Sequence, residues 1–246
     1  MTNSVLPIAT GAQMAAVDRA MVDVCGLELM QIMETAGRAV AMVTRSRWRA
    51  LETDRPVVIL CGSGGNGGDG FVAARYLAGW GIPIELWLMR PSLEMRGLAA
   101  HQLDVCHRLE LPIIEPDRSA DVAHAALIVD GLFGFGLSAA PTGRAAELIS
   151  AATAAAAPIL AIDIASGLDA TTGVAYRPAI RADLTVTLGL PKSGLLLADG
   201  PACSGTVIVA DIGIPAAAYA ATDIPETVVF RDAEFVDLSG VPVEIR

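Results

Sequence analysis

The sequence predicts an α/β fold in which helices cover both faces of a parallel sheet. Two features of the 246 residues indicate it: apolar runs of strand length alternate with segments of helical periodicity, and those runs are apolar on both faces. A third feature, 53% hydrophobic residues without an internal repeat or a low-complexity linker, favours one domain spanning residues 1–246.

The elements follow in a regular order. Two helices open the chain, and the first has Thr10 as a candidate cap. Strands and helices then alternate, and shorter strands close the chain. The helices are predicted over 9–24, 27–46, 69–78, 94–109 and 143–156, with a turn or short helix over 119–124. The strands are predicted over 57–61, 84–89, 111–114, 126–130, 158–163, 183–189, 205–215 and 227–230.

Three of these strands run into glycine-rich loops: GSGGNGGDG over 62–70, GLFGFGLSAAPTG over 131–143 and IASGLDATTG over 164–173. Loops that leave the carboxyl ends of parallel strands share one edge of the sheet, where ligands bind. A need for tight turns would explain the glycines of one such loop. It explains three loops less well, since each also has an aspartate at the strand end or helix start. We therefore expect the loops to form one site.

Composition excludes several classes of function. A net charge of −10 argues against nucleic acid or an acidic membrane as the main partner. The apolar stretches are too short to span a bilayer and the N-terminus does not resemble a signal peptide, so a cytoplasmic location is expected. Four cysteines without a C-x-x-C pair and three histidines without metal-ligand spacing indicate neither disulfides nor a histidine–cysteine metal site.

Lys192 is the single lysine among seventeen basic residues. Arginine is effectively never deprotonated, whereas lysine can be tuned as an acid or base. The presence of one lysine in an arginine-rich chain has two explanations. It is either chance or a function at this position that arginine cannot perform.

Several motifs in this order resemble the YjeF N-terminal domain family. They are the opening LMQIMETAG, then NGGDG, DGLFGFGL, DIASGLD and PKSGL, and the similarity runs from about residue 9 to residue 237. The resemblance implies a Rossmann-like three-layer αβα sandwich with a mostly parallel central sheet. It also implies NAD(P)H-hydrate epimerase activity, in which the R and S forms of hydrated NADH or NADPH are interconverted as metabolite repair.

The resemblance also implies site residues. Asn66, Asp130 and Ser166 would bind one potassium ion per subunit. The substrate would be bound by Gly65, Asn66, Gly67, Gly68, Asp69, Gly134, Phe135, Gly136, Leu137, Ser138, Ala139, Ala140 and Asp163. Two positions depart from the family pattern: Gly65 replaces an asparagine and Ala165 a proline. Gly65 puts one side-chain hydrogen bond to the ligand in doubt.

A dinucleotide phosphate needs donors, yet the first glycine loop has neither lysine nor arginine. Backbone N–H groups and a helix N-terminus can hold it, and glycine allows a close approach. Asp69, a carboxylate beside an anion, fits better as the helix cap or as an acceptor for loop N–H groups.

Epimerisation at a carbon that carries a hydroxyl beside the ring nitrogen needs an acid for the departing oxygen and a base for its return. Asp163 is the candidate carboxylate, although a simple acceptor for a ribose hydroxyl is the alternative. Lys192 is the candidate second proton donor or an electrostatic anchor.

A non-catalytic nucleotide-sensing or scaffold module on the same fold is the competing function. Asn66, Asp130, Asp163 and Lys192 are all present, which favours the enzyme. An ADP- or ATP-dependent dehydratase, separate or fused, is the expected partner. A homodimer and packing of the opening helices on their own domain are alternatives. The sequence shows no obvious pair of arginines that would bind a 2′-phosphate. It therefore does not indicate whether the NADH-derived or the NADPH-derived substrate is preferred.

Overall fold

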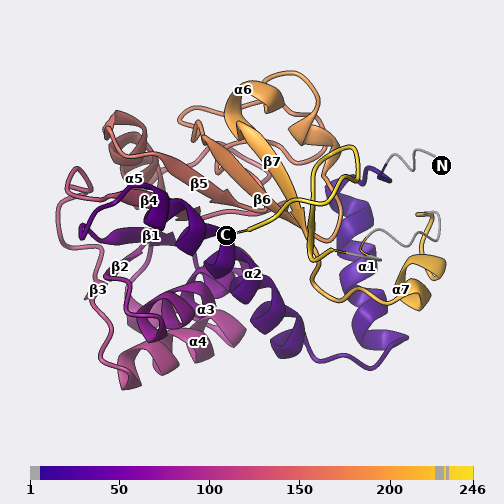
Figure 1. The fold of residues 1–246 in the computed structure, drawn as a ribbon, viewed down its shortest axis with the longest axis horizontal. Coiled ribbons are helices and arrows are strands. Elements are labelled where there is room, and N and C mark those ends of the chain that lie inside the picture. The colour runs from indigo at the N-terminus through magenta and orange to yellow at the C-terminus, as the bar shows by residue number, and fades with distance from the viewer. Residues whose placement is uncertain (1–5, 225–229, 231–232, 246) are drawn as a thin grey trace.

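The computed structural model describes residues 6–224, 230 and 233–245. Its centre is one sheet with the strand order β3-β2-β1-β4-β5-β6-β7-β8 (Figure 1). All neighbouring strands are parallel except β7 and β8. The predicted mostly parallel αβα architecture is therefore confirmed.

The strands are β1 (Val57–Cys61), β2 (Ile84–Leu88), β3 (Ile113–Ile114), β4 (Leu127–Gly131), β5 (Ile159–Ile162), β6 (Leu184–Leu188), β7 (Thr206–Ala210) and β8 (Phe235–Val236). The α-helices are α1 (Gly11–Asp23), α2 (Leu29–Ala50), α3 (Gly65–Gly79), α4 (Gly97–Arg108), α5 (Gly143–Ala154), α6 (Gly200–Ser204) and α7 (Ala216–Ala220).

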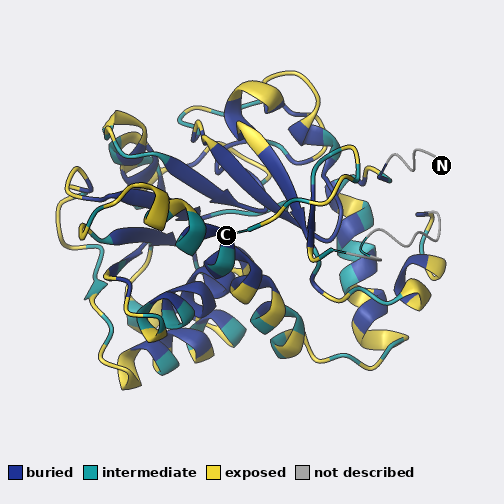
Figure 2. Ribbon diagram, viewed as in Figure 1, coloured by how far each residue is buried: buried dark blue, intermediate teal, exposed yellow. Residues whose placement is uncertain are grey.

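Successive side chains of β1 point to opposite faces of the sheet. Ile59 packs into the cluster formed with α2, α3 and α4, whereas Leu60 packs into the cluster formed with α5. Figure 2 shows the resulting buried centre between exposed outer helix surfaces. Because helices cover both faces, the strands are mostly apolar, and the site is expected at their ends.

The first helix is fixed onto the end of the sheet by both backbone and side chains. Thr10 forms a capping box with Gln13, as the sequence predicts for the helix start. The N–H of Ala9 donates to the carbonyl of Pro191 at 3.0 Å, and Ala9 accepts from the N–H of Ser193 at 2.8 Å. The buried side chains of α1 pack against α7 and Leu190. This helix packs on its own domain, and a homodimer stays a prediction.

The main differences from the predicted elements lie at element starts. Helix α3 begins at Gly65, not at residue 69, and α4 begins at Gly97 after a short 3₁₀ turn over Ser92–Glu94. The short helices α6 and α7 and strand β8 were not predicted, and the strand predicted over 227–230 falls outside the described residues except Phe230. None of the described helices has both the length and the apolar character that crossing a membrane requires.

Candidate active site

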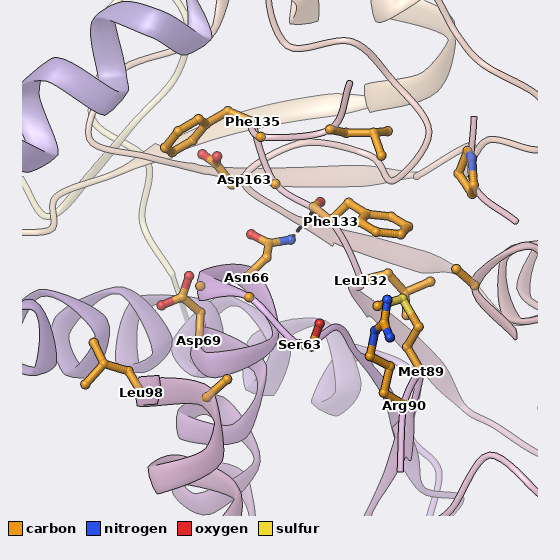
Figure 3. A pocket seen from close by; sticks show the side chains of 18 of the residues that line it. Ser63, Asn66, Asp69, Met89, Arg90, Leu98, Leu132, Phe133, Phe135 and Asp163 are labelled. Carbon is orange, nitrogen blue, oxygen red and sulfur yellow. Dashed lines mark hydrogen bonds between the residues drawn. The ribbon is translucent and has the colours of Figure 1, made fainter. Parts of the chain in front are cut away.

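A pocket of about 1210 Å³ opens at the carboxyl edge of the sheet, large enough for a dinucleotide (Figure 3). The loops after β1, β2 and β4 line it, and the segment after β5 contributes Asp163. Among the predicted residues, the lining contains Gly65, Asn66, Asp69, Gly134, Phe135, Gly136, Leu137, Ser138, Ala139, Ala140, Asp163 and Lys192. Gly67, Gly68, Asp130 and Ser166 do not line it.

The glycines after β1 mostly serve the protein's own packing. A Cβ added at Gly62 would lie 1.9 Å from the carbonyl oxygen of Leu132. A Cβ added at Gly67 would lie 1.9 Å from the carbonyl oxygen of Gly62. At Gly68 it would meet Met33 at 2.4 Å. The expectation that these glycines clear space for a phosphate therefore needs correction. Only Gly64 and Gly65, at the start of α3, have open space around them.

Asp69 does not cap its helix, contrary to the prediction. The N-cap of α3 is Gly64, so Asp69 lies one turn inside the helix and its buried side chain faces the pocket. Figure 3 shows its carboxyl group directed to the same space as Asn66 and Asp163. The N–H groups at the start of α3 are consequently left to a ligand, as a helix N-terminus allows.

Asp163 lies where β5 ends, in a sharp turn. Its φ of +65° is in the left-handed region, which aspartate adopts more readily than most residues. Oδ1 of its buried carboxylate accepts hydrogen bonds from the Leu188 N–H at 3.1 Å, from Thr187 Oγ1 at 3.3 Å and from Lys192. No hydrogen bond from a described residue reaches Oδ2, which leaves that oxygen for a ligand in the pocket.

Lys192 is buried with Asp163 as an ion pair. Besides the aspartate, Nζ donates to the Leu188 carbonyl at 2.8 Å and approaches Thr187 Oγ1 at 3.5 Å. An ammonium group has three donors, and these three acceptors engage them all. The structure therefore places Lys192 as the partner of Asp163 rather than as a free donor toward the pocket.

The three predicted cation ligands lie around the loop that follows β4, with Asn66 in the pocket wall and Asp130 and Ser166 behind it. Ser166 Oγ donates to Asp130 Oδ1 at 2.6 Å, and the Ser166 N–H donates to Asp130 Oδ2 at 2.7 Å. Asn66 Nδ2 donates to the carbonyls of Phe133 at 2.9 Å and Ile162 at 3.0 Å. Burial raises the pKa of Asp130 to about 6, although the bonds from Ser166 oppose this. The donor set consists of oxygens around one buried carboxylate, which suits a hard cation.

Comparison with known proteins identifies the family. The family described as YjeF-related protein N-terminus matches residues 29–194. The chain belongs to this family. An NAD(P)H-hydrate epimerase from Dehalogenimonas lykanthroporepellens is 36% identical over 208 residues, which cover 84% of this chain and 82% of that protein.

Other members of the YjeF-related family are longer. A bifunctional NAD(P)H-hydrate repair enzyme from Salinibacter ruber is 37% identical over 85% of this chain, but this chain spans only 41% of its length. The crystal structure of the yeast protein ynu0 superposes with a TM-score of 0.77 at 22% identity, covering 94% of this chain and 100% of the yeast chain. That similarity confirms the fold.

Asp18 is a pocket residue of this YjeF-family chain that sequence reasoning missed. It lies on α1 and lines the pocket near Lys192 and Asp163. Burial raises its pKa to about 6, with Lys192 opposing and Asp163 reinforcing the shift. The sequence does not show where this helix lies relative to the pocket, so it gives no indication that Asp18 belongs to the site.

Asp69 is the second carboxyl group of the pocket lining, after Asp18, whose pKa is raised. Burial raises its pKa well above the ordinary value of 3.8, and the neighbouring carboxylates of Asp163 and Asp18 add to the effect. Lys192 alone opposes it. The pocket thus brings three carboxyl groups around one lysine that is already paired, and at least one of them keeps its proton where an ordinary aspartate is ionised.

Proposed function

We propose that this protein is an NAD(P)H-hydrate epimerase that interconverts the R and S forms of hydrated NADH or NADPH. The observation that carries the proposal is the buried Asp163–Lys192 pair, whose aspartate leaves Oδ2 toward the pocket. Relatives of similar length that carry the name NAD(P)H-hydrate epimerase support it. A scaffold or sensing module has no need of this catalytic arrangement.

The reaction centre of the substrate is the carbon that carries the hydroxyl next to the ring nitrogen. By one route the C–O bond breaks, the acid gives its proton to the leaving hydroxyl, and water then adds to the other face of the iminium and gives its proton to the base, from which it returns to the acid. By the other route the C–N bond breaks, the base takes the hydroxyl proton and the acid protonates the ring nitrogen. Closure on the other face of the aldehyde then reverses both transfers. Asp163 is the base and takes the proton at Oδ2, because none of the described residues donates a hydrogen bond to that oxygen. Lys192 fixes the carboxylate through Oδ1 and holds its orientation.

The departing oxygen needs an acid, and Asp69 fits that role. Burial and the neighbouring carboxylates raise its pKa well above the ordinary value, which favours the protonated form, whereas its neighbour Asp163 is paired with an ammonium group. Two titratable groups in different environments of one pocket can thereby act as acid and base. Asp18 stands beside them as a further carboxyl group with a raised pKa.

The R-to-S ratio of hydrated NADH, followed by NMR from pure S, tests the proposal. Spontaneous epimerisation without protein gives the baseline. A rate at least about a hundredfold above the baseline is expected, since one positioned acid–base group contributes that much. A rate at the baseline, with ADP-ribose still bound, would make the protein a sensing module.

A potassium ion held by Asn66, Asp130 and Ser166 is part of this proposal. The Asp130 carboxylate, the Ser166 hydroxyl and two backbone carbonyls supply oxygens, and Asn66 would turn its amide to present Oδ1. When bound, the ion would supply positive charge behind the pocket wall. The residues themselves fix the loop after β4 against the start of α3 whether or not the ion is bound.

Potassium is expected to raise the melting temperature at constant ionic strength. Replacing a large organic cation by K⁺ at about ten times its Kd should add roughly 3–5 °C. Asn66→Ala should remove this increase and weaken NADP⁺ binding as well, because Asn66 faces both the carbonyls and the pocket. Asp104→Asn, an exposed change on α4, is the control. An unchanged potassium effect in Asn66→Ala would contradict the assignment.

Gly65→Asn, which restores the usual residue of the family, should improve ligand binding without harming the fold. A Cβ at Gly65 meets no atom within 4 Å, and the position lies in the pocket wall at the first turn of α3. One added hydrogen bond should lower the Kd for NADP⁺ about three- to tenfold. Calorimetric titration gives the result, and Gly67→Asn is the contrasting variant that should fail to fold. A weaker ligand affinity in Gly65→Asn would show that the open space at this position is needed.

A dehydratase that consumes the S form is the proposed functional partner. The bifunctional repair enzymes among the relatives support this, since the chain matches only about two fifths of their length. A cytoplasmic location fits this reaction and stays a prediction.

A further inference from the structure

The charges in the pocket are separated into two ends. Asp18, Asp69 and Asp163 line the end near Lys192, whereas Arg90, Arg96 and Arg144 line the pocket together with one carboxylate, Glu94. Figure 3 shows Arg90 and Met89 on the side away from Asp69 and Asp163. Strands β1 and β4 lie between β2 and β5, so the two ends are roughly 14 Å apart, three spacings between neighbouring strands. Arg90 and Arg144 have one carboxylate partner each, Glu94 and Glu147, and Arg96 lines the pocket as a third cation.

Arg144 is a partly buried cation whose hydrogen bonds are incomplete. Its side chain is 11% exposed, and Nη1 pairs with Glu147 at 3.2 Å. Nε and Nη2 are enclosed without a hydrogen-bond partner among the described residues. The guanidinium carbon lies 6.0 Å from the ring centre of Trp87 in β2. Unpaired buried donors are costly, and in native proteins they commonly mark the place of a ligand. A turn of this side chain toward the pocket would let an anion satisfy them.

Arg90 reaches the same end of the pocket from another element. It lies two residues after the end of β2, and its exposed side chain makes only a loose pair with Glu94 at 3.8 Å. In dinucleotide-binding α/β folds this position lies at the adenosine ribose, where an acidic residue selects a 2′-hydroxyl and arginine accommodates a 2′-phosphate. Arg96 is less available because Nη1 already donates to the carbonyls of Leu93 and Met95.

We infer that Arg90 and Arg144 bind the 2′-phosphate of the substrate, so that the protein prefers hydrated NADPH to hydrated NADH. The inference rests on the proposed function and adds the identity of the nucleotide. The phosphate dianion meets two guanidinium groups, one just after the end of β2 and one in the first turn of α5, while the start of α3 is left for the pyrophosphate. The two arginines are 54 positions apart, which is why the sequence shows no arginine pair.

Calorimetric titration with NADP⁺ and NAD⁺ tests the inference without depending on turnover. The wild-type protein should bind NADP⁺ at least about tenfold more tightly, because charge-assisted hydrogen bonds to phosphate are strong. Arg90→Gln and Arg144→Gln should each reduce this ratio several-fold, and the ratio of kcat/KM for the two hydrated substrates should fall in parallel. Arg90→Gln should not disturb folding, since the Arg90 side chain is 58% exposed, so a change in its binding ratio can be read directly. Arg108→Gln on α4, 77% exposed, should keep the wild-type ratio.

Two results would overturn the inference while leaving the epimerase in place. One is equal affinity of the wild-type protein for both nucleotides. The other is an equal loss of affinity for NADP⁺ and NAD⁺ in both arginine variants, which would assign the arginines to the pyrophosphate. Absence of binding together with absence of epimerisation would reject the proposed function and the inference with it.

Discussion

Asp163→Asn is expected to lower kcat for epimerisation by about 10²–10⁴-fold, the usual contribution of a positioned acid–base group. The amide keeps the shape of the carboxylate and can still accept hydrogen bonds from Lys192 and Leu188. Asparagine also tolerates the left-handed backbone at this position. What it loses is the ability to take a proton at Oδ2. The variant should therefore remain folded by circular dichroism while turnover is lost.

The kinetic form of the loss separates the two roles of Asp163. A lower kcat at similar KM indicates proton transfer, whereas a higher KM at unchanged kcat indicates an acceptor for a ribose hydroxyl. Asp183→Asn is the matched control, because Asp183 is an exposed aspartate that precedes β6 at the opposite edge of the sheet. It should keep activity within about twofold, as surface changes away from a site do. Near-normal kcat and KM in Asp163→Asn would remove this residue from the reaction.

The strand ends were the predictable part of the site. Buried apolar runs fix β1, β4 and β5, and parallel pairing then places Asn66, the loop over 134–140 and Asp163 at one edge. This follows from periodicity and topology alone. The resemblance to the YjeF family added the expected activity and the departure at Gly65.

Long-range packing decided what the sequence could not show. Asp18 reaches the pocket because Ala9 bonds to Pro191 and Ser193, a contact between distant segments. Asp69 lines the pocket as the family resemblance implies, but it does not cap its helix, because α3 starts four residues before it. Gly62 and Gly67 are similar: glycine near a ligand and glycine against protein backbone look alike in a sequence, and only the structure distinguishes them.

Lys192→Met is expected to destabilise the folded protein by about 3–5 kcal/mol, because it leaves the buried Asp163 carboxylate without its partner. Methionine matches the length of the lysine stem, so lost packing contributes little. Epimerisation should fall as well, since the carboxylate loses its charged partner and keeps only the hydrogen bonds from the Leu188 N–H and Thr187 Oγ1. Urea unfolding gives the free energy, and the loss should exceed that of a change to an exposed cation.

The double variant Lys192→Met/Asp163→Asn distinguishes loss of the charge pair from loss of packing. With both charges removed, no buried ion lacks a partner, and stability should return to within about 1–2 kcal/mol of the wild type. The exposed Arg108–Asp104 pair on α4 is the matched control, because solvent screens this pair and its cycle should show little or no coupling. Additive losses at Asp163 and Lys192 would instead mean that the two side chains act independently. Activity should not return in the double variant, since the amide that replaces the carboxylate cannot take a proton even in a stable fold.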